Sequence, residues 1–530
     1  VNEGVATVSE PQTTEQYDTR RYELQTFVCR GEYRKGMERI LSSYVDNLGS
    51  QEQPAAWVSG FYGSGKSHLV KMLRYVWENY EFDDGATARG IATLHQDVRE
   101  LLKELDTVGR RGGGLHAASG TLGSSAGSVR MAILSIIFQS VGLPGEYPKA
   151  RFIMWLRKEG YYDTVKTYVE DQGEDFREEL DYMYVSPTLA KGLLQADPDF
   201  AENPSDIRNY LRNEFPDKEG VSDTEMVKGI RDALAPDGNY PCTLVVLDEV
   251  EQYIGGDSNR CYQVQLATEA CTKQFGAKLL FVATGQSALT GAKELPKLQG
   301  RFPLHIELSD ADVEKVTREV VLAKDASKKT EVEDVIEECR AEIDRHLVES
   351  EIGPRTKDDD VLVPEYPLLP VRRRFWEHVL RSVDTRGTTS QLRSQLRVID
   401  DAVKATAEKP LGTVVPADFV YDVNATKMVQ SGALLAEIHD LILEFKEGDE
   451  DEQLKGRLCA LAYLISQLPS EGAGNIGVRA TKETFADLLV EDLTKGSTEL
   501  RRRIPELLEE LVDAGHLMQV EDEYRIQTQE

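Results

Sequence analysis

Residues near the start of the chain have the types and spacing that could hold the phosphates of a nucleotide. The stretch WVSGFYGSGKSHLVKML, residues 57 to 73, fits the pattern G-x-x-x-x-G-K-[ST]. Glycines allow consecutive backbone N–H groups to curl around phosphates, and the start of a helix adds favourable partial charge. An apolar stub before the loop and a helical pattern after it favour this interpretation over a glycine-rich turn. We predict that the binding segment comprises Gly60, Phe61, Tyr62, Gly63, Ser64, Gly65, Lys66, Ser67 and His68.

The lysine and the serine of this segment have separate roles in such a site. Lys66 would contact the β- and γ-phosphates, and the Ser67 hydroxyl would help to hold Mg²⁺. The other half of such a nucleotide site could come from TLVVLDEVEQYIGG, residues 243 to 256. In this stretch a continuous apolar run ends in Asp248 and Glu249. Asp248 would hold the water shell of Mg²⁺, and Glu249 could polarise the attacking water. A buried strand that ends in acids is common, so this interpretation depends on its pairing with the glycine loop.

A third stretch, AKLLFVATGQSAL, residues 277 to 289, reads as another apolar strand that ends in polar residues. Thr284 or Gln286, placed between the two acids and the γ-phosphate, could orient water. The alternative is a strand that is followed by an ordinary turn.

Three arginines are candidates to stabilise or sense phosphate charge. Arg301, in LQGRFPLHIEL, precedes the last strand of the expected sheet and could reach the nucleotide of a neighbouring subunit, or it could form a surface salt bridge. Arg393 and Arg397 lie four residues apart on one helix face. Either could sense the γ-phosphate from a helical lid, or simply pair with Asp400 and Asp401.

These residues must be positioned by strands and helices that alternate along the chain. Continuous apolar strands separated by helices indicate a parallel sheet that is buried on both faces. From about residue 310 onward, helices replace strands. The last part reads as three helices closed by a hairpin, HLMQVEDEYRIQT, which is the order of a winged helix. The fold class that this pattern predicts is α/β.

A chain of 530 residues is too long for one core. The acidic stretch EGDEDEQ, residues 447 to 453, is predicted to be a solvated joint. The predicted parts are a helical lead-in over residues 1–50, a nucleotide-binding core over 51–310 with a helical insertion at about 140–238, a helical lid over 311–425, and a winged-helix-like domain over 426–530.

Composition narrows the class of protein further. Hydrophobic residues make up 40% of the chain and charged residues 29%, and no long apolar run offers a membrane span. The six cysteines are scattered without the spacing of a zinc site or a disulfide framework, which favours a reducing, cytoplasmic location. The formal net charge of −30 repels nucleic acid in general, so any DNA contact must come from local basic patches. The chain begins at Val1, and we expect it to be a fragment of a longer protein.

Two basic patches are candidates for such contacts. Arg501, Arg502 and Arg503 open the third helix of the expected winged helix, which in a DNA-binding protein would meet the major groove. Acidic residues further along that helix and in the hairpin favour a protein contact slightly over duplex DNA. PVRRRFW, residues 370 to 376, could be a nucleic-acid patch or a buried network of arginines and carboxylates.

Together these motifs resemble the AAA+ ATPases of the branch that includes origin-recognition and Cdc6-type initiators. A closer resemblance is to the P-loop ATPase of BREX phage-defence systems, the BrxC/PglY family, of which this chain resembles the N-terminal part. The segments that carry this resemblance are GFYGSGKSHLVKML, VVLDEVEQYIG, LQGRFPLHIELSDADVEKV, YPLLPVRRRFWEHVLRSVD, SQLRSQLRVIDDAV and KPLGTVVPADFVYD.

The resemblance implies an AAA+ P-loop NTPase core with a lid and a winged helix, which uses ATP and Mg²⁺ and forms oligomers. It also implies a phage-defence assembly with a DNA methyltransferase and an alkaline-phosphatase-like protein. By position, Thr284 or Gln286 would be sensor 1, Arg301 the finger and Arg393 sensor 2. Two alternatives to an ATP hydrolase remain: a nucleotide-gated scaffold that hardly hydrolyses, and an origin-recognition-like loader that binds DNA.

Overall fold

A computed structural model describes most of the chain, which divides into two compact units, Val1–Asp312 and Val313–Glu530. The structure describes residues 8, 14–60, 64–122, 128–286, 295–308, 317–383 and 391–527.

The first unit is built around a parallel sheet of five strands in the order β2-β3-β4-β1-β5. Its strands are β1 (Ala56–Gly60), β2 (Leu115–Thr121), β3 (Cys242–Asp248), β4 (Leu279–Thr284) and β5 (Leu304–Leu308). Strands β1, β3 and β4 are buried along their whole length, as their continuous apolar sequences predict. The registers place Thr284 beside Val58, and Leu247 beside Ala283. The carboxyl ends of these three neighbouring strands therefore meet at one edge of the sheet.

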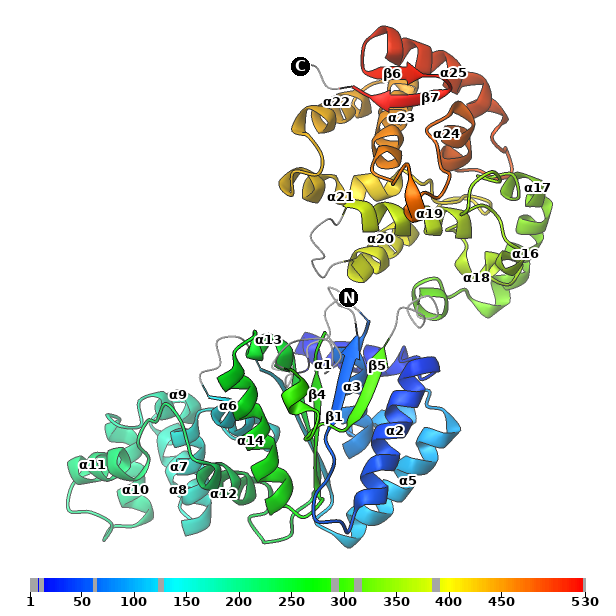
Figure 1. Ribbon diagram of the computed structural model, residues 1–530. Helices are drawn as coiled ribbons and strands as arrows, with labels where there is room; N and C mark the ends of the chain where they lie inside the picture. The colour runs from blue at the N-terminus through cyan, green and yellow to red at the C-terminus, as the bar shows by residue number, and fades with distance from the viewer. Residues whose placement is uncertain are drawn as a thin grey trace. The chain divides into compact units, whose positions relative to one another are not determined.

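Helices cover both faces of this sheet. Figure 1 shows α2 (Gly31–Asn47) and α5 (Gln96–Arg111) on one side, and α6 (Val129–Ser140) and α14 (Ser258–Gln274) on the other. Helix α3 (Lys66–Glu78) begins directly after the glycine loop and contacts α2 and α5. The remaining helices of this part are α1 (Thr14–Gln25), α4 (Ala88–Ile91), α13 (Val250–Ile254) and a 3₁₀ turn over Leu295–Leu298.

A helical insertion separates α6 from β3 in the sequence. It consists of α7 (Tyr147–Glu159), α8 (Tyr162–Asp171), α9 (Phe176–Asp181), α10 (Pro187–Ala196), α11 (Pro204–Glu214) and α12 (Asp223–Leu234). Aromatic rings around Trp155 fill its centre, including those of Phe152 and Phe215 at centroid distances of 6.1 and 5.9 Å from Trp155. Helix α12 packs against α6 and α14, which joins the insertion to the core of the first unit.

The second unit is mainly helical and ends in a winged helix. Helices α23, α24 and α25 are followed by the antiparallel hairpin β6–β7, and the amide of Tyr524 in β7 donates to Ala480 O at 2.8 Å, just before α24. This is the predicted order of a winged helix. The elements are a π-helix over Thr317–Val321, α16 (Lys329–Glu338), α17 (Arg340–Ile343), α18 (Leu362–Glu365), α19 (Pro370–Val383), α20 (Gln391–Thr406), α21 (Phe419–Gln430), α22 (Ala436–Lys446), α23 (Glu450–Ser466), α24 (Lys482–Leu489), α25 (Thr498–Asp513), β6 (Leu517–Val520) and β7 (Glu523–Ile526), with short 3₁₀ turns at Ala326–Lys328, Thr356–Asp360 and Gly472–Gly474.

One apolar core runs through this unit from Leu322 to Tyr524. It includes residues on both sides of the predicted boundary between the lid and the winged helix at residue 425. The division of the chain into four parts stays a prediction.

The acidic stretch at 447 to 453 is largely exposed, as expected of a solvated joint, but only residues 447 to 449 form the connection between α22 and α23. Helix α23 begins within the acidic stretch, and the Asp449 side chain accepts hydrogen bonds from the amides of Asp451 and Glu452 at 3.0 and 3.1 Å. Carboxylates at a helix N-terminus satisfy free N–H groups and interact favourably with the helix dipole. The acidic run is therefore a helix start.

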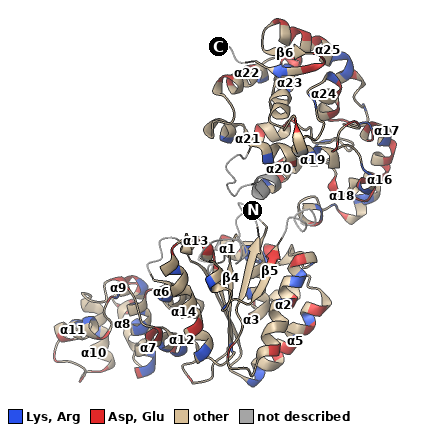
Figure 2. Cartoon of the chain, in the orientation of Figure 1, with Lys and Arg blue, Asp and Glu red and all other residues tan. Residues whose placement is uncertain are grey.

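Charges of both signs alternate on the helices of each unit, while the sheet is largely uncharged (Figure 2). All six cysteines are buried free thiols. Within the described ranges, no helix is long and apolar enough to cross a membrane. The predicted α/β fold class is confirmed: the chain has a parallel sheet covered by helices in its first unit and the element order of a winged helix at the end of its second.

Candidate nucleotide-binding site

The glycine loop lies between the carboxyl end of β1 and the start of α3, where phosphate-binding loops are found. Gly65 is the N-cap of α3 and has left-handed backbone angles, with φ of 83°. The Lys66 ammonium donates to Gly60 O at 2.8 Å, so the lysine side chain folds back over the loop. Ser67 is half-buried in the first turn of the helix. Phe61, Tyr62 and Gly63 lie outside the described residues.

Tyr33 of α2 braces this loop, which the sequence analysis missed. Its buried hydroxyl donates to Ser64 O at 3.0 Å. A Cβ added at Gly65 would lie 1.6 Å from the Tyr33 hydroxyl oxygen, so only glycine fits at this position. Tyr33 has no local signal beyond its place in a helical pattern, because a contact between residues far apart in the chain leaves no local motif.

The loop has the steric and polar features of a phosphate cradle. A Cβ at Gly60 would lie 2.6 Å from both Leu308 O and the Ser64 hydroxyl oxygen, so glycine is required where the backbone turns away from β5. The Ser64 hydroxyl is buried and has no hydrogen-bond partner in the described part of the chain. Free donors at a helix start fit the oxygen atoms of a phosphate group.

His68 faces the N-terminal helices. Its ring packs edge-on against Phe27 at a centroid distance of 5.6 Å. Burial, with a smaller effect of Lys71, lowers the pKa of His68 to about 4, so the ring is neutral at neutral pH. Lys71 forms a buried ion pair with Glu23 of α1 at 2.5 Å. Helices α1 and α2 are therefore packed onto the helix that follows the phosphate loop.

Asp248, Glu249 and Thr284 form one hydrogen-bonded group at the carboxyl ends of β3 and β4. Asp248 is buried, and the Thr284 hydroxyl donates to its carboxylate. The same hydroxyl oxygen accepts the backbone N–H of Glu249 at 3.0 Å. Thr284 thus holds both acids through a single oxygen atom, as a residue that orients the acidic pair would.

The backbone of Glu249 is left-handed, with φ of 59° and ψ of 31°. A side chain other than glycine in this conformation costs about 1–3 kcal/mol and tends to be kept where function needs it. The left-handed turn at Glu249 ends the path of β3 and starts α13, at the sheet edge that carries the glycine loop.

Gln286 lies just beyond β4, and its side chain is exposed. Its backbone N–H donates to the Glu251 carboxylate at 2.6 Å. Glu251 was not among the predicted site residues, although it stands in the quoted stretch VVLDEVEQYIG.

Arg301 lies at the other end of the sheet from the glycine loop. Strand β5 runs parallel to β1, with Leu304 beside Ala56 and Leu308 beside Gly60. Arg301 precedes β5, so a strand of five residues, about 16 Å long, separates it from the loop. Its guanidinium pairs with Glu269 at 2.8 Å and with Glu52 at 3.7 Å. The chain's own Arg301 is therefore not placed at its own phosphate loop.

Arg393 lies in α20 of the second unit, and its side chain is outside the described part of the structure. Arg397, one turn later, is exposed and pairs with Asp401 at 3.6 Å. The pairing that we considered for Arg397 is thus observed, and the sensor role of Arg393 stays a prediction.

The arginines at the start of α25 are each paired with a carboxylate of the same unit. Arg501 binds Asp487, Arg502 binds Glu499 at 2.7 Å, and Arg503 binds Asp451. Arg502 is the most exposed of the three, at 68%, against 27% for Arg501 and 29% for Arg503. The patch therefore presents less free positive charge than its sequence suggests, and duplex DNA as its partner stays a prediction.

The run of arginines in α19 is a buried network. Arg372 is fully buried and donates to three backbone carbonyls. Arg373 binds the buried Glu365 at 3.1 Å, and Arg374 binds Asp358 through two hydrogen bonds of 2.7 and 2.8 Å. Of the two interpretations that the sequence left open, the network of arginines and carboxylates is the one observed, and a nucleic-acid contact is excluded for the buried Arg372.

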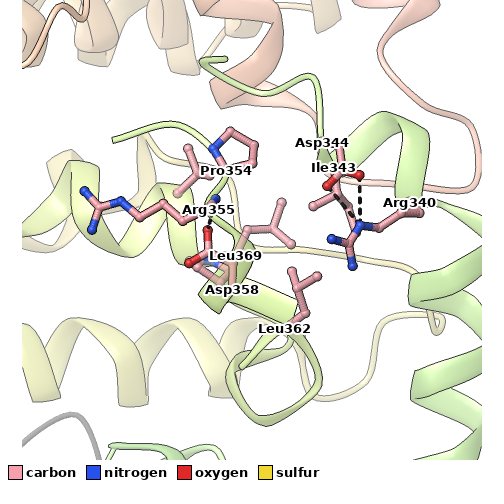
Figure 3. Close-up of a pocket in the computed structure, with 10 residues that line it drawn as sticks. Arg340, Ile343, Asp344, Pro354, Arg355, Asp358, Leu362 and Leu369 are labelled. Atoms are coloured by element: carbon pink, nitrogen blue, oxygen red, sulfur yellow. Dashed lines mark hydrogen bonds and ion pairs between the residues drawn. The ribbon is translucent and has the colours of Figure 1, made fainter. Parts of the chain in front are cut away.

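A small hollow in the second unit is lined by apolar and paired charged residues (Figure 3). Arg340 donates twice to Asp344 at 2.9 Å, and the backbone N–H of Arg355 donates to Asp358 at 3.0 Å. Leu362 and Leu369 form an apolar part of the lining. In this hollow Arg340 pairs with Asp344, and Asp358 pairs with Arg374.

Comparison with known proteins adds a distant likeness in overall fold. No protein-family model matches the chain. The chain is similar to the ORC1 protein of Aeropyrum pernix solved in complex with DNA, at 12% identity and a TM-score of 0.34, over 96% of this chain and 93% of that chain. It is also similar to Drosophila ORC bound to DNA, at 12% identity and a TM-score of 0.28, over 98% of this chain and 92% of that chain. These TM-scores are too low for either likeness to bear on what this chain does.

Proposed function

We propose that this chain is an AAA+ ATPase that binds Mg-ATP at the edge of its parallel sheet. The observation that carries the proposal is the meeting of three strand ends at that edge. The glycine loop follows β1, Asp248 ends β3, and Thr284 ends β4, with a hydroxyl that joins both acids. Ligands of open α/β sheets bind outside the carboxyl ends of the strands.

Each residue has a defined task in this proposal. The loop amides from Gly60 to Gly65 and the Lys66 ammonium hold the phosphates, and Lys66 exchanges its bond with Gly60 O for phosphate oxygen. Ser67 and Asp248 hold Mg²⁺, which neutralises charge that develops on the phosphates. Glu249 polarises the attacking water, and Thr284 and Gln286 keep the acids and the water in line. Tyr33 holds the loop in its binding conformation.

The first test is ATP turnover by the whole chain and by two variants. Glu249→Gln should bind ATP with unchanged affinity and lose turnover by about a hundredfold or more, because only the water-activating carboxylate is removed. Lys66→Ala should lose binding itself. Glu174→Ala, an exposed carboxylate in the helical insertion, is the matched control. Normal turnover by Glu249→Gln would show that Glu249 is not the catalytic residue.

A second test addresses Arg301, which we propose acts on the nucleotide of a neighbouring subunit. Its place at the far end of its own sheet supports action between chains. Specific activity should rise with protein concentration as subunits associate. A mixture of Lys66→Ala, with an intact Arg301, and Arg301→Ala, with an intact loop, should recover activity that neither variant has alone. If the mixture recovers no activity and Arg301→Ala is fully active by itself, the proposed role of Arg301 as a finger is rejected. Arg393→Ala tests the proposed sensor 2 in the same assay.

We also propose that the chain serves as the ATPase of a BREX-type phage-defence assembly, in the cytoplasm and in contact with DNA. The support is the sequence likeness of the segments that span residues 57 to 422. In a host that carries such a system, Lys66→Ala in the full-length protein should abolish phage resistance without lowering protein abundance. Retained resistance in that variant would favour a scaffold that does not need nucleotide.

Two further experiments identify the alternative functions. Sedimentation with and without ATP would identify a nucleotide-gated scaffold, which assembles without turnover. Binding of labelled duplex DNA at low salt would identify a DNA loader.

A further inference from the structure

Glu251 makes a second link between the two strand ends of the proposed site, in addition to the link made by Thr284. It lies on α13, directly after the acidic pair, and its carboxylate accepts the backbone N–H of Gln286 at 2.6 Å. Gln286 follows β4. A carboxylate that accepts a backbone N–H makes a shorter and stronger hydrogen bond than a neutral acceptor does.

The hydrogen bonds of Thr284 and of Glu251 connect the same two segments, one starting from each segment. Thr284 of β4 reaches the residues that follow β3, through the Asp248 carboxylate and the Glu249 amide. Glu251, which also follows β3, reaches back to the amide of Gln286 after β4. Each segment thus holds the other, and the left-handed Glu249 lies between the two links in the sequence.

Gly285 shows how tightly this region is packed. A Cβ at this position would lie 2.2 Å from Trp57 Cζ2 and 3.0 Å from Glu251 Oε2. The Gly285 amide also donates to Val58 O at 3.0 Å. The backbone at Gly285 therefore packs against both β1 and the Glu251 carboxylate.

We propose that Glu251 is a positioning residue for ATP hydrolysis: by accepting the Gln286 amide it fixes the segment after β4 against the acidic pair. The inference rests on the proposed function and adds a residue to it. Glu251 acts through Gln286 and Thr284, and the water-activating role remains with Glu249. Loss of this link should slow the chemical step and leave nucleotide binding intact, because the phosphates are held by the loop after β1.

The test compares three variants of the whole chain with the wild type. Glu251→Ala removes the acceptor and should lower kcat by about tenfold or more, with the Kd for ATP changed by no more than about twofold. Glu251→Gln keeps a carbonyl oxygen at the same reach and should restore kcat to within about threefold of the wild type. Glu174→Ala is the control for removal of an exposed carboxylate from the same unit. Hydrogen exchange of a peptide that ends at Gln286 should be faster in Glu251→Ala and normal in Glu251→Gln.

Each outcome decides the proposal. If the wild type turns over ATP and Glu251→Ala has the same kcat, the positioning role is overturned. The proposed function is not affected by that result. A loss in Glu251→Gln as deep as in Glu249→Gln also overturns the positioning role, because the charge itself would then act in the chemistry. Loss of ATP affinity in Glu251→Ala would show a general structural role. A wild type without any turnover would reject the proposed hydrolysis, and the positioning role with it.

Discussion

The hydroxyl of Thr284 donates a hydrogen bond to the buried carboxylate of Asp248, across the neighbouring strands β3 and β4. The same oxygen atom accepts the Glu249 amide at 3.0 Å. A buried carboxylate needs such donors, because an unpaired charge away from water is costly. One threonine thereby satisfies a buried acid and fixes the backbone of the acid that follows it.

Removal of this hydroxyl should affect both stability and turnover. Thr284→Val keeps the shape of the side chain but leaves the Asp248 carboxylate and the Glu249 amide without their partner. We expect the first unit to lose about 1–3 kcal/mol of unfolding free energy, with kcat reduced by about tenfold or more. Urea denaturation and an ATP turnover assay measure the two effects.

Thr284→Ser is the matched control for this experiment. It keeps the hydroxyl and removes one methyl group, which costs about 1 kcal/mol. Turnover near the wild-type level in Thr284→Ser, with loss in Thr284→Val, assigns the effect to the hydrogen bonds. Equal turnover in all three proteins would remove Thr284 from the site.

The brace between Tyr33 and the glycine loop predicts a specific effect on nucleotide affinity. Tyr33→Phe removes the hydroxyl that donates to Ser64 O and leaves the ring in place. A neutral hydrogen bond contributes about 0.5–1.5 kcal/mol, so the Kd for ATP should rise by about three- to tenfold. Isothermal titration measures the change. Tyr22→Phe alters an exposed tyrosine in the same helical lead-in and should bind ATP as the wild type does.

The glycine loop and the strands beside it were predictable because their signals are local. A G-x-x-x-x-G-K-S motif and two apolar runs ending in polar residues require no knowledge of distant contacts. The strand order was not predictable, because the helical insertion separates β2 from β3 in the sequence. Tyr33 and Glu251 were missed for a related reason. Each bonds to a backbone atom of another segment, and such a bond leaves no residue pattern.

Charged clusters were the hardest part of the sequence to interpret. The run of three arginines at 372 to 374 is compatible with a surface patch or with a buried network. Only the positions of Glu365 and Asp358 in the fold decide between the two interpretations. Positive charge in a sequence shows where guanidinium groups occur. It does not show which carboxylates the fold places beside them.

Two half-buried histidines predict that the first unit weakens in mild acid. Burial lowers the pKa of His68 and of His116 to about 4, with smaller effects of Lys71 on His68 and of Arg74 on His116. The unfolded chain takes up these protons near pH 6.5, before the folded chain does, so stability falls as the pH falls from about 6.5 to about 4. Each histidine should contribute up to about 3 kcal/mol over this window. Urea denaturation at a series of pH values measures the slope.

His68→Gln should flatten that dependence, since glutamine does not titrate. His305→Gln is the control, because His305 is an exposed histidine of the same unit. If the pH dependence of unfolding is the same in His68→Gln as in the wild type, the His68 ring does not contribute to it.

The Arg372 side chain links α19 to the winged helix, and we expect this link to stabilise the second unit. Its guanidinium donates to Val415 O at 2.5 Å, and to Asp487 O and Val490 O at 3.1 and 2.6 Å, at the end of α24. Arg372→Met retains the apolar stem and leaves three buried carbonyls without a donor, so the second unit should lose about 3 kcal/mol or more. Arg502→Met, which removes a largely exposed arginine from α25, should change stability by less than about 0.5 kcal/mol. The two variants are compared by denaturation of the second unit. Equal effects would mean that burial of Arg372 does not stabilise this unit, because the carbonyls would then find other donors.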